Sequence, residues 1–134
     1  MRLRMHAMID LKRLDHIVLT VANIEQSCEF YSRVLGMKIE IFGHGKKGLS
    51  FGNQKINLHE HGREFEPKAR NPRPGSADLC FISDTPLDEV IEHLKRCGVA
   101  IELGPVERSG ATGMIQSVYL RDPDLNLIEI ANEV

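Results

Sequence analysis

A repeated order of predicted elements constrains the fold of this 134-residue chain more than any other feature. Each half reads as a strand, a helix, a glycine, a second strand, a loop and two further strands. His16 precedes Gly36 by 20 residues, and Asp78 precedes Gly98 by the same 20. Matched spacing favours duplication of one unit over a chance recurrence. One unit alone would expose a face of a small sheet, so the two must pack together or against another chain.

Period-two alternation and helix signals give the elements of repeat one, residues 14–60. Asn23 is the predicted N-cap of a helix with Gln26 as its capping-box partner, and Gly36 ends that helix. The predicted strands of this repeat are residues 14–21, 37–42, 48–51 and 55–59.

The same signals recur in repeat two, residues 76–132. Thr85 is the predicted N-cap of its helix, with Pro86 in the first helical position and Gly98 at the end. The predicted strands are residues 77–82, 99–103, 114–120 and 127–131, with a glycine-bearing loop at 104–113 and a turn at 122–124.

Two segments fall outside this pattern. Residues 61–75 hold three prolines and two glycines without an apolar period, which predicts a long linker loop between the repeats. Loops of this length in compact domains are often functional. Residues 1–13 are predicted to be a disordered tail, which leaves a single domain over 14–132.

Charge and composition exclude several classes of partner. The net charge is −2 and no basic run exceeds two residues, so no nucleic-acid partner is expected. No apolar stretch is long enough to span a membrane, so no membrane partner is expected either. Cys28, Cys80 and Cys97 are too scattered for a disulfide framework and are expected to be small buried thiols in a reducing cytoplasm.

Metal-ligating residue types occur on the predicted strands at corresponding places in the two repeats. His16 and Asp78 open the two repeats, and Glu129 lies on the last strand. Buried unpaired, each would be costly, and convergence on a divalent cation removes that cost. A histidine with carboxylates suits Mn, Fe, Co, Ni or Zn. Asn57 and His59 share one face of the last strand of repeat one, which makes His59 a further candidate ligand.

Each of these residues also has a purely structural interpretation. A lone strand histidine is more often a satisfied core or rim residue than a ligand. Glu129 could pair with a basic side chain, and Asp78 could cap a turn. His59 could belong to a solvated strand end together with Glu60 and His61.

Three segments together resemble the vicinal oxygen chelate superfamily, over about residues 14–132. They are LDHIVLTVANIEQSCEFYSRVLGM, GPVERSG and YLRDPDLNLIEI. That superfamily includes glyoxalase I, extradiol dioxygenases, fosfomycin-resistance proteins and bleomycin-binding proteins. Within it, the chain most resembles short glyoxalase-domain proteins labelled lactoylglutathione lyase-like or biphenyl-2,3-diol 1,2-dioxygenase III-related, a group that includes an enterobacterial virulence protein.

The resemblance implies an α+β fold in which two βαβββ repeats form a cupped mixed sheet around a metal site. His16 and Glu129 match the family's ligand positions. Asn57 stands where glyoxalase I has a glutamate, and Asp78 stands where the family has a histidine. Leu125 replaces the usual glycine of the turn, at a cost in turn geometry.

The first function that these residues suggest is a metal-dependent lyase or isomerase acting on a small oxygenated substrate, such as a glutathione adduct of a 2-oxoaldehyde. The divalent metal (Ni, Co, Zn, Mn or Fe) would polarise a carbonyl, with Glu129 or Asp78 as the catalytic base. The candidate substrate-binding residues are Asn57, Arg63, Arg108 and Arg121, with Lys47 as a further candidate clamp.

Two other functions stay open. An extradiol dioxygenase with Fe(II) needs two histidines and a carboxylate, which only His59 could complete. A non-enzymatic binding or resistance protein would rely on an aromatic groove, and the chain has no Trp, two Tyr and five Phe. For each of these functions the expected partner is a small molecule, and the expected assembly is a homodimer.

Overall fold

The computed structural model describes residues 8–134, and within them two repeated modules of one helix and four strands. Module one contains β1 (His16–Val21), α1 (Ile24–Arg33), β2 (Lys38–Phe42), β3 (Lys46–Phe51) and β4 (Gln54–Glu60). Module two contains β5 (Asp78–Ile82), α2 (Leu87–Arg96), β6 (Leu103–Ser109), β7 (Met114–Arg121) and β8 (Leu127–Glu133).

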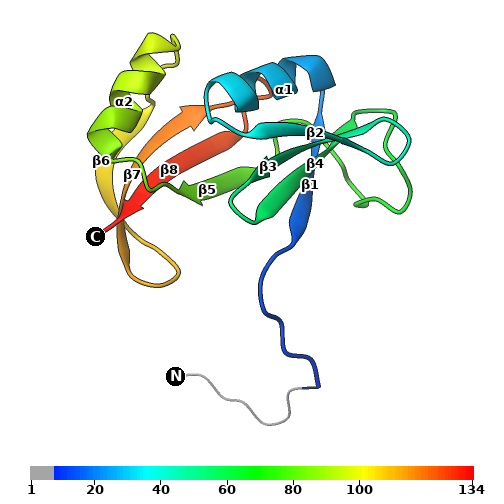
Figure 1. Cartoon of the computed structure of the whole chain (residues 1–134), viewed down its shortest axis with the longest axis horizontal. Helices are drawn as coiled ribbons and strands as arrows, with labels where there is room; N and C mark the ends of the chain where they lie inside the picture. Colours follow the sequence, from blue (N-terminus) through cyan, green and yellow to red (C-terminus); the bar gives the residue numbers. More distant parts are fainter. Residues whose placement is uncertain (1–7) are drawn as a thin grey trace.

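The strands form two four-stranded mixed sheets of the same topology. Sheet A has the order β1-β4-β3-β2, and sheet B has the order β5-β8-β7-β6. In each sheet the first pair is parallel and the other pairs are antiparallel. Both helices lie on the same side of the sheets (Figure 1). The predicted α+β class with two βαβββ repeats is therefore confirmed, and each repeat forms its own sheet.

The strand registers define which residues are equivalent in the two modules. His16 is the first residue of β1, and Asp78 is the first residue of β5. Two residues further on, Val18 pairs with Asn57 in sheet A, and Cys80 pairs with Glu129 in sheet B. Asn57 and Glu129 therefore occupy the same place in their modules, as His16 and Asp78 do.

The two helices begin in different ways. The predicted cap of α1 is confirmed, because Asn23 Oδ1 accepts a 2.9 Å hydrogen bond from the Gln26 amide. The predicted cap of α2 is wrong. Pro86 occupies the N-cap position without a side-chain hydrogen bond, and the Leu87 amide instead donates to Asn132 Oδ1 on β8 at 2.7 Å. A cap supplied by a distant strand leaves no local sequence signal.

The other difference lies in β6, which spans Leu103–Ser109, where the sequence predicted a strand at 99–103 and a loop at 104–113. Gly104 misled that prediction because glycine next to proline usually marks a turn. Here a Cβ on Gly104 would lie 2.5 Å from the Ser117 carbonyl oxygen of β7. The glycine therefore permits a close approach of two paired strands.

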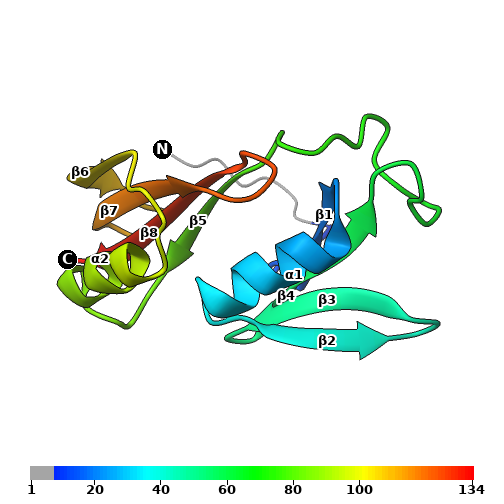
Figure 2. The same ribbon diagram turned by 90° about the horizontal axis from the view of Figure 1, so that it is seen from above.

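The modules share one hydrophobic core, and they lie side by side when viewed from above (Figure 2). Phe51 of β3 and Phe81 of β5 contact each other edge to face across the boundary, with ring centroids 5.2 Å apart. Tyr31 of α1 donates a 2.6 Å buried hydrogen bond to Asp122 in the β7–β8 turn. These contacts fix one module against the other.

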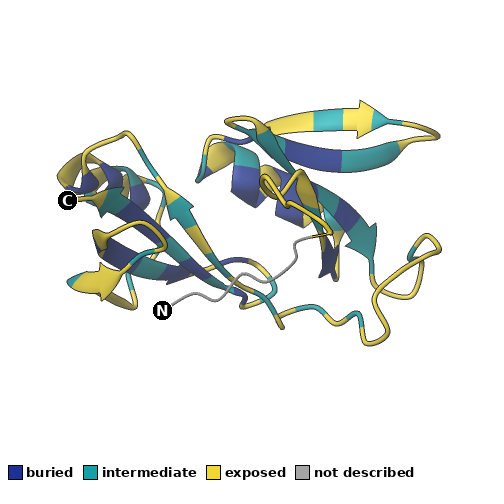
Figure 3. Ribbon diagram, turned by 90° about the horizontal axis from the view of Figure 1, so that it is seen from below, coloured by how far each residue is buried: buried dark blue, intermediate teal, exposed yellow. Residues whose placement is uncertain are grey.

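The linker between β4 and β5 contains no helix or strand and is largely exposed (Figure 3). Of the predicted tail, residues 8–13 are exposed and without regular structure, and the remainder lies outside the described residues. Across 8–134, neither helix has the length and apolar character that a membrane crossing requires.

Replacing Leu125 with glycine should raise the free energy of unfolding by about 0.5–1 kcal/mol. Leu125 has a φ of 69°, the left-handed conformation that disfavours L-residues, and its side chain is 67% exposed. Chemical denaturation of Leu125→Gly and Leu125→Ala would separate two effects, the loss of backbone strain and the loss of the side chain. Both variants lose the leucine side chain, but only glycine adopts a positive φ without strain. Equal stability of the two variants would contradict the prediction.

Candidate metal and substrate site

The candidate ligands lie on the faces of the two sheets that the helices leave uncovered, called here the open faces. On β4, Ile56 and Leu58 are buried under α1, so Lys55, Asn57 and His59 alternate onto the open face of sheet A. The same alternation places His16 there and places Asp78, Cys80 and Glu129 on the open face of sheet B.

His16 and Cys80, on the open faces of the two sheets, have different charged neighbours. His16 is exposed, and its Nδ1 lies 3.0 Å from Asp15 Oδ2, a hydrogen bond that lowers the pKa of the Asp15 carboxyl. Burial, together with the nearby Glu129 carboxylate, raises the pKa of the Cys80 thiol to about 11. Cys80 is nevertheless an exposed residue, which corrects the prediction that all three cysteines are buried; only Cys28 is.

The four predicted metal ligands do not converge within one chain. Among residues 8–134, no group of three or more His, Cys, Asp or Glu side chains is close enough to hold a metal ion. Instead, His16 and His59 belong to sheet A, and Asp78 and Glu129 belong to sheet B. Each open face therefore carries half of the predicted set.

Asn57 supplies a test of whether these donors suit a metal ion. Its Oδ1 atom is buried, and no hydrogen-bond donor in the described chain reaches it. Gly48 is the residue on β3 that pairs with Asn57, and a Cβ at Gly48 would lie 3.1 Å from that oxygen. A buried acceptor without a partner is costly. An amide oxygen, an imidazole and carboxylates are together a chemically suitable ligand set for a divalent cation, and in one chain they are divided between the two sheets.

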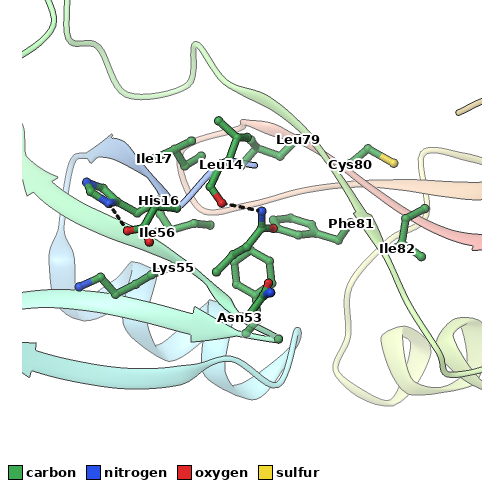
Figure 4. A pocket seen from close by; sticks show the side chains of 14 residues that line it. Leu14, His16, Ile17, Asn53, Lys55, Ile56, Leu79, Cys80, Phe81 and Ile82 are labelled. Carbon is green, nitrogen blue, oxygen red and sulfur yellow. Dashed lines mark hydrogen bonds and ion pairs between the residues drawn. The ribbon is translucent and has the colours of Figure 1, made fainter. Parts of the chain in front are cut away.

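His16 also lines a cavity of about 380 Å³ between the edge strands β1 and β5. The walls are mainly apolar, with Ile17 and Ile56 from sheet A and Leu79 and Phe81 from sheet B. Figure 4 shows His16 at one end of this cavity and Cys80 towards the other. A mostly apolar cavity with few polar groups is typical of small-molecule sites.

The predicted arginine clamps differ in how freely they could contact a substrate. The guanidinium of Arg121 donates to both carboxylate oxygens of Glu102 at 2.9 and 3.0 Å and to the Leu125 carbonyl at 3.1 Å, a structural role. Arg63 is exposed beside Glu60. Arg108 Nε donates to the hydroxyl of Tyr119 at 3.1 Å, and Tyr119 pairs with Glu129 in the sheet. Arg108 is therefore linked to a candidate ligand through Tyr119. Arg121 lies close enough to Asp78 for their opposite charges to interact.

Sequence reasoning missed the lysines of the open face of sheet A. Lys55 is two residues from Asn57 on β4, and Lys46 lies on β3. Period-two alternation along Lys55, Asn57 and His59 could have placed the first of these beside the candidate ligands.

Comparisons with known proteins give a consistent result. Residues 13–130 match the family model described as the Glyoxalase/Bleomycin resistance protein/Dioxygenase superfamily. The virulence protein STM3117 of Salmonella typhimurium is 54% identical over 124 residues, which cover 92% of this chain and 86% of that protein. The glyoxalase domain-containing protein RDO1 of Mycosarcoma maydis is 47% identical over 129 residues, covering 96% of this chain and 73% of that protein.

Solved structures are similar over nearly the whole chain. An integron cassette protein from the mobile metagenome of Vibrio cholerae is 55% identical with a TM-score of 0.93, covering 95% of this chain and 99% of that one. FosX of Listeria monocytogenes, solved with Mn(II), is 22% identical with a TM-score of 0.64 and 93% coverage of each chain. That lower identity shows a shared fold alone.

Proposed function

Because the chain belongs to the Glyoxalase/Bleomycin resistance protein/Dioxygenase superfamily, we propose that it is a metal-dependent enzyme of the glyoxalase type. The proposed activity is a lyase or isomerase reaction on a small oxygenated substrate, such as a glutathione adduct of a 2-oxoaldehyde. The proposed metal ligands are His16, Asp78 and Glu129, with Asn57 Oδ1 completing the set.

One observation carries this proposal, namely that ligand-type side chains occupy equivalent positions in the two modules. His16 and Asp78 open β1 and β5, and Asn57 and Glu129 share the other equivalent position. Unrelated surface residues would not be expected to repeat in this way. The unpartnered Asn57 Oδ1 supports the same interpretation, because a ligand at this place would satisfy it.

The side chains of the chain suit proton abstraction next to a carbonyl. A bound divalent metal would supply Lewis-acid polarisation of that carbonyl. The carboxylate of Glu129, half-buried on β8, would accept the proton from the neighbouring carbon, and Asp78 is the alternative base. His59 is a weaker ligand candidate, because its ring packs against Phe65 of the linker with centroids 5.6 Å apart.

The division of the ligands between two sheets makes a homodimer part of the proposal. A two-fold arrangement would bring sheet A of one copy to sheet B of a second copy and would create two equal sites. We further propose a reducing cytoplasmic location, consistent with three free cysteines.

A thermal-shift experiment tests the metal site. Chelator-treated protein would be melted with Mn, Fe(II), Co, Ni and Zn in turn. Metal at 100 times its dissociation constant should stabilise the wild type by about 2.7 kcal/mol, a rise of several degrees, and should not stabilise His16→Ala or Glu129→Ala.

His44→Ala is the matched control, because His44 lies exposed in the β2–β3 turn and should leave the metal response unchanged. A wild type that no metal stabilises would remove the basis of the enzyme and would favour the non-enzymatic binding function. A stabilised wild type would then be assayed with the hemithioacetal of methylglyoxal and glutathione, and lack of turnover with every metal would exclude the glyoxalase reaction.

A further inference from the structure

A connected group of cationic and aromatic side chains covers part of the open face of sheet A. We call it the basic cluster, and it consists of Phe42, Lys46, Lys55, His59 and Phe65. The Lys55 ammonium lies 3.9 Å from the centroid of the Phe42 ring, and Phe42 pairs across the strands with Lys46. The Lys46 ammonium lies 4.6 Å from the centroid of Phe65, a linker residue that also contacts His59.

The two lysines lack the partners that half-buried cations usually have. Across residues 8–134, neither ammonium has a hydrogen-bond acceptor or a salt-bridge partner, although Lys47 next along β3 pairs with Glu25 at 3.1 Å. Aromatic rings stabilise these charges only partly, because each ammonium keeps N–H donors that a ring does not satisfy. The cluster therefore holds positive charge that no salt bridge within residues 8–134 neutralises, although Asp15 is close enough for Lys55 to contribute to lowering the pKa of its carboxyl.

The cluster lies beside the proposed metal ligands. The side chains of Lys55 and Asn57 both lie over Gly48, where a Cβ would meet the Lys55 Cδ at 3.3 Å and the Asn57 Oδ1 at 3.1 Å. Lys55 is thus a direct neighbour of the unpartnered amide oxygen. A substrate group held by Lys55 would be within one small molecule's length of a group held at Asn57.

The geometry points to a substrate that carries an oxyanionic group, which Lys55 and Lys46 bind beside the proposed metal ligands. This group is a carboxylate, a phosphate or a phosphonate. This inference rests on the proposed function, since it names the substrate class of the same site. Ammonium groups bind oxyanions as point charges with strong charge-assisted hydrogen bonds. It also replaces Arg63 and Arg121 as the substrate clamps, because their guanidinium groups lie beside carboxylates of this chain.

Anion titration of chelator-treated full-length protein tests the inference without metal. Inorganic phosphate and acetate would be added separately, and amide chemical shifts of residues 42–65 would be followed by NMR. Lys55→Met and Lys46→Met should each weaken binding of the preferred anion about tenfold or more, since each removes one charge-assisted contact. Lys55→Arg should keep most of the affinity, and Lys95→Met, exposed on α2, should keep all of it. The preferred anion would distinguish carboxylate from phosphate or phosphonate.

Unchanged shifts at residues 42–65, or equal affinity in the wild type and both methionine variants, would overturn the inference. The inference would also be overturned if Lys55→Met and Lys46→Met weakened dimerisation but left anion affinity intact. The two lysines would then contact a second copy of the chain and not the substrate. The metal response of the methionine variants separates the two proposals. Loss of anion binding with the metal response retained supports the inference, and a metal-insensitive wild type refutes the proposed function alone.

Discussion

Replacing Asp122 with alanine is expected to lower the free energy of unfolding by about 3–5 kcal/mol. Asp122 is 3% exposed and accepts four hydrogen bonds, of which one comes from Tyr31 in the other module. The others come from the amides of Asp124 and Asn126 and from the Asn126 side chain, at 2.8–2.9 Å. Alanine would leave these donors without an acceptor, which lowers the stability of the folded state because buried donors are costly when unpaired.

Chemical denaturation of three variants would check this expectation. Tyr31→Phe removes one of the four donors and should cost about 1–3 kcal/mol. Combining it with Asp122→Ala should cost less than the sum of the two, because both remove the same contact. Asp84→Ala, exposed between β5 and α2, should change stability by less than about 0.5 kcal/mol. A loss below about 1 kcal/mol in Asp122→Ala would show that the network contributes little.

The Asp122 network also shows why the sequence was enough to identify the family but not enough to predict the contact between Tyr31 and Asp122. The segment from Asp122 to Asn126 was part of the resemblance, whereas its partner Tyr31 lies 91 residues away. Asp124 Oδ1 likewise accepts from the Ala22 amide of module one at 3.1 Å. Local patterns identify a turn, but they do not identify which distant donor the turn binds. The same limit explains the missed α2 cap, where Asn132 replaces Thr85.

The secondary structure was predictable wherever periodicity and capping agree. The helix after Asn23 and the four strands of module one were predicted to within two residues at each strand boundary. The prediction failed at β6, where Gly104 serves strand packing instead of a turn. Alternation alone does not distinguish these two uses of glycine.

For the candidate site, sequence patterns identified the candidate residues but did not predict how they are arranged in space. Repeat equivalence related His16 to Asp78, and the strand registers extend it to Asn57 and Glu129. The separation of these residues onto two sheets depends on how the modules pack, which no local pattern encodes. The basic cluster depends in turn on contacts among β2, β3, β4 and the linker, such as that between Lys46 and Phe65.

Mixing two inactive variants should restore metal binding if the ligands are shared between two copies. His16→Ala damages sheet A, and Glu129→Ala damages sheet B. In a two-fold dimer that contains one chain of each kind, one site combines both defects and the other site is intact. After random subunit exchange, half of the dimers are mixed, so about a quarter of the wild-type metal sites should reappear.

Metal stoichiometry, measured after mixing the two variants under conditions that allow exchange, decides between the possible arrangements. Each variant alone should bind no metal at this site. If the site lay within a single chain, every site in the mixture would carry a defect and no binding would return. Restoration to about a quarter would instead require the open faces of two copies to meet, because no single chain in the mixture holds an intact His16 together with an intact Glu129. This complementation experiment tests the shared site directly, because it measures bound metal and requires no assumption about the substrate.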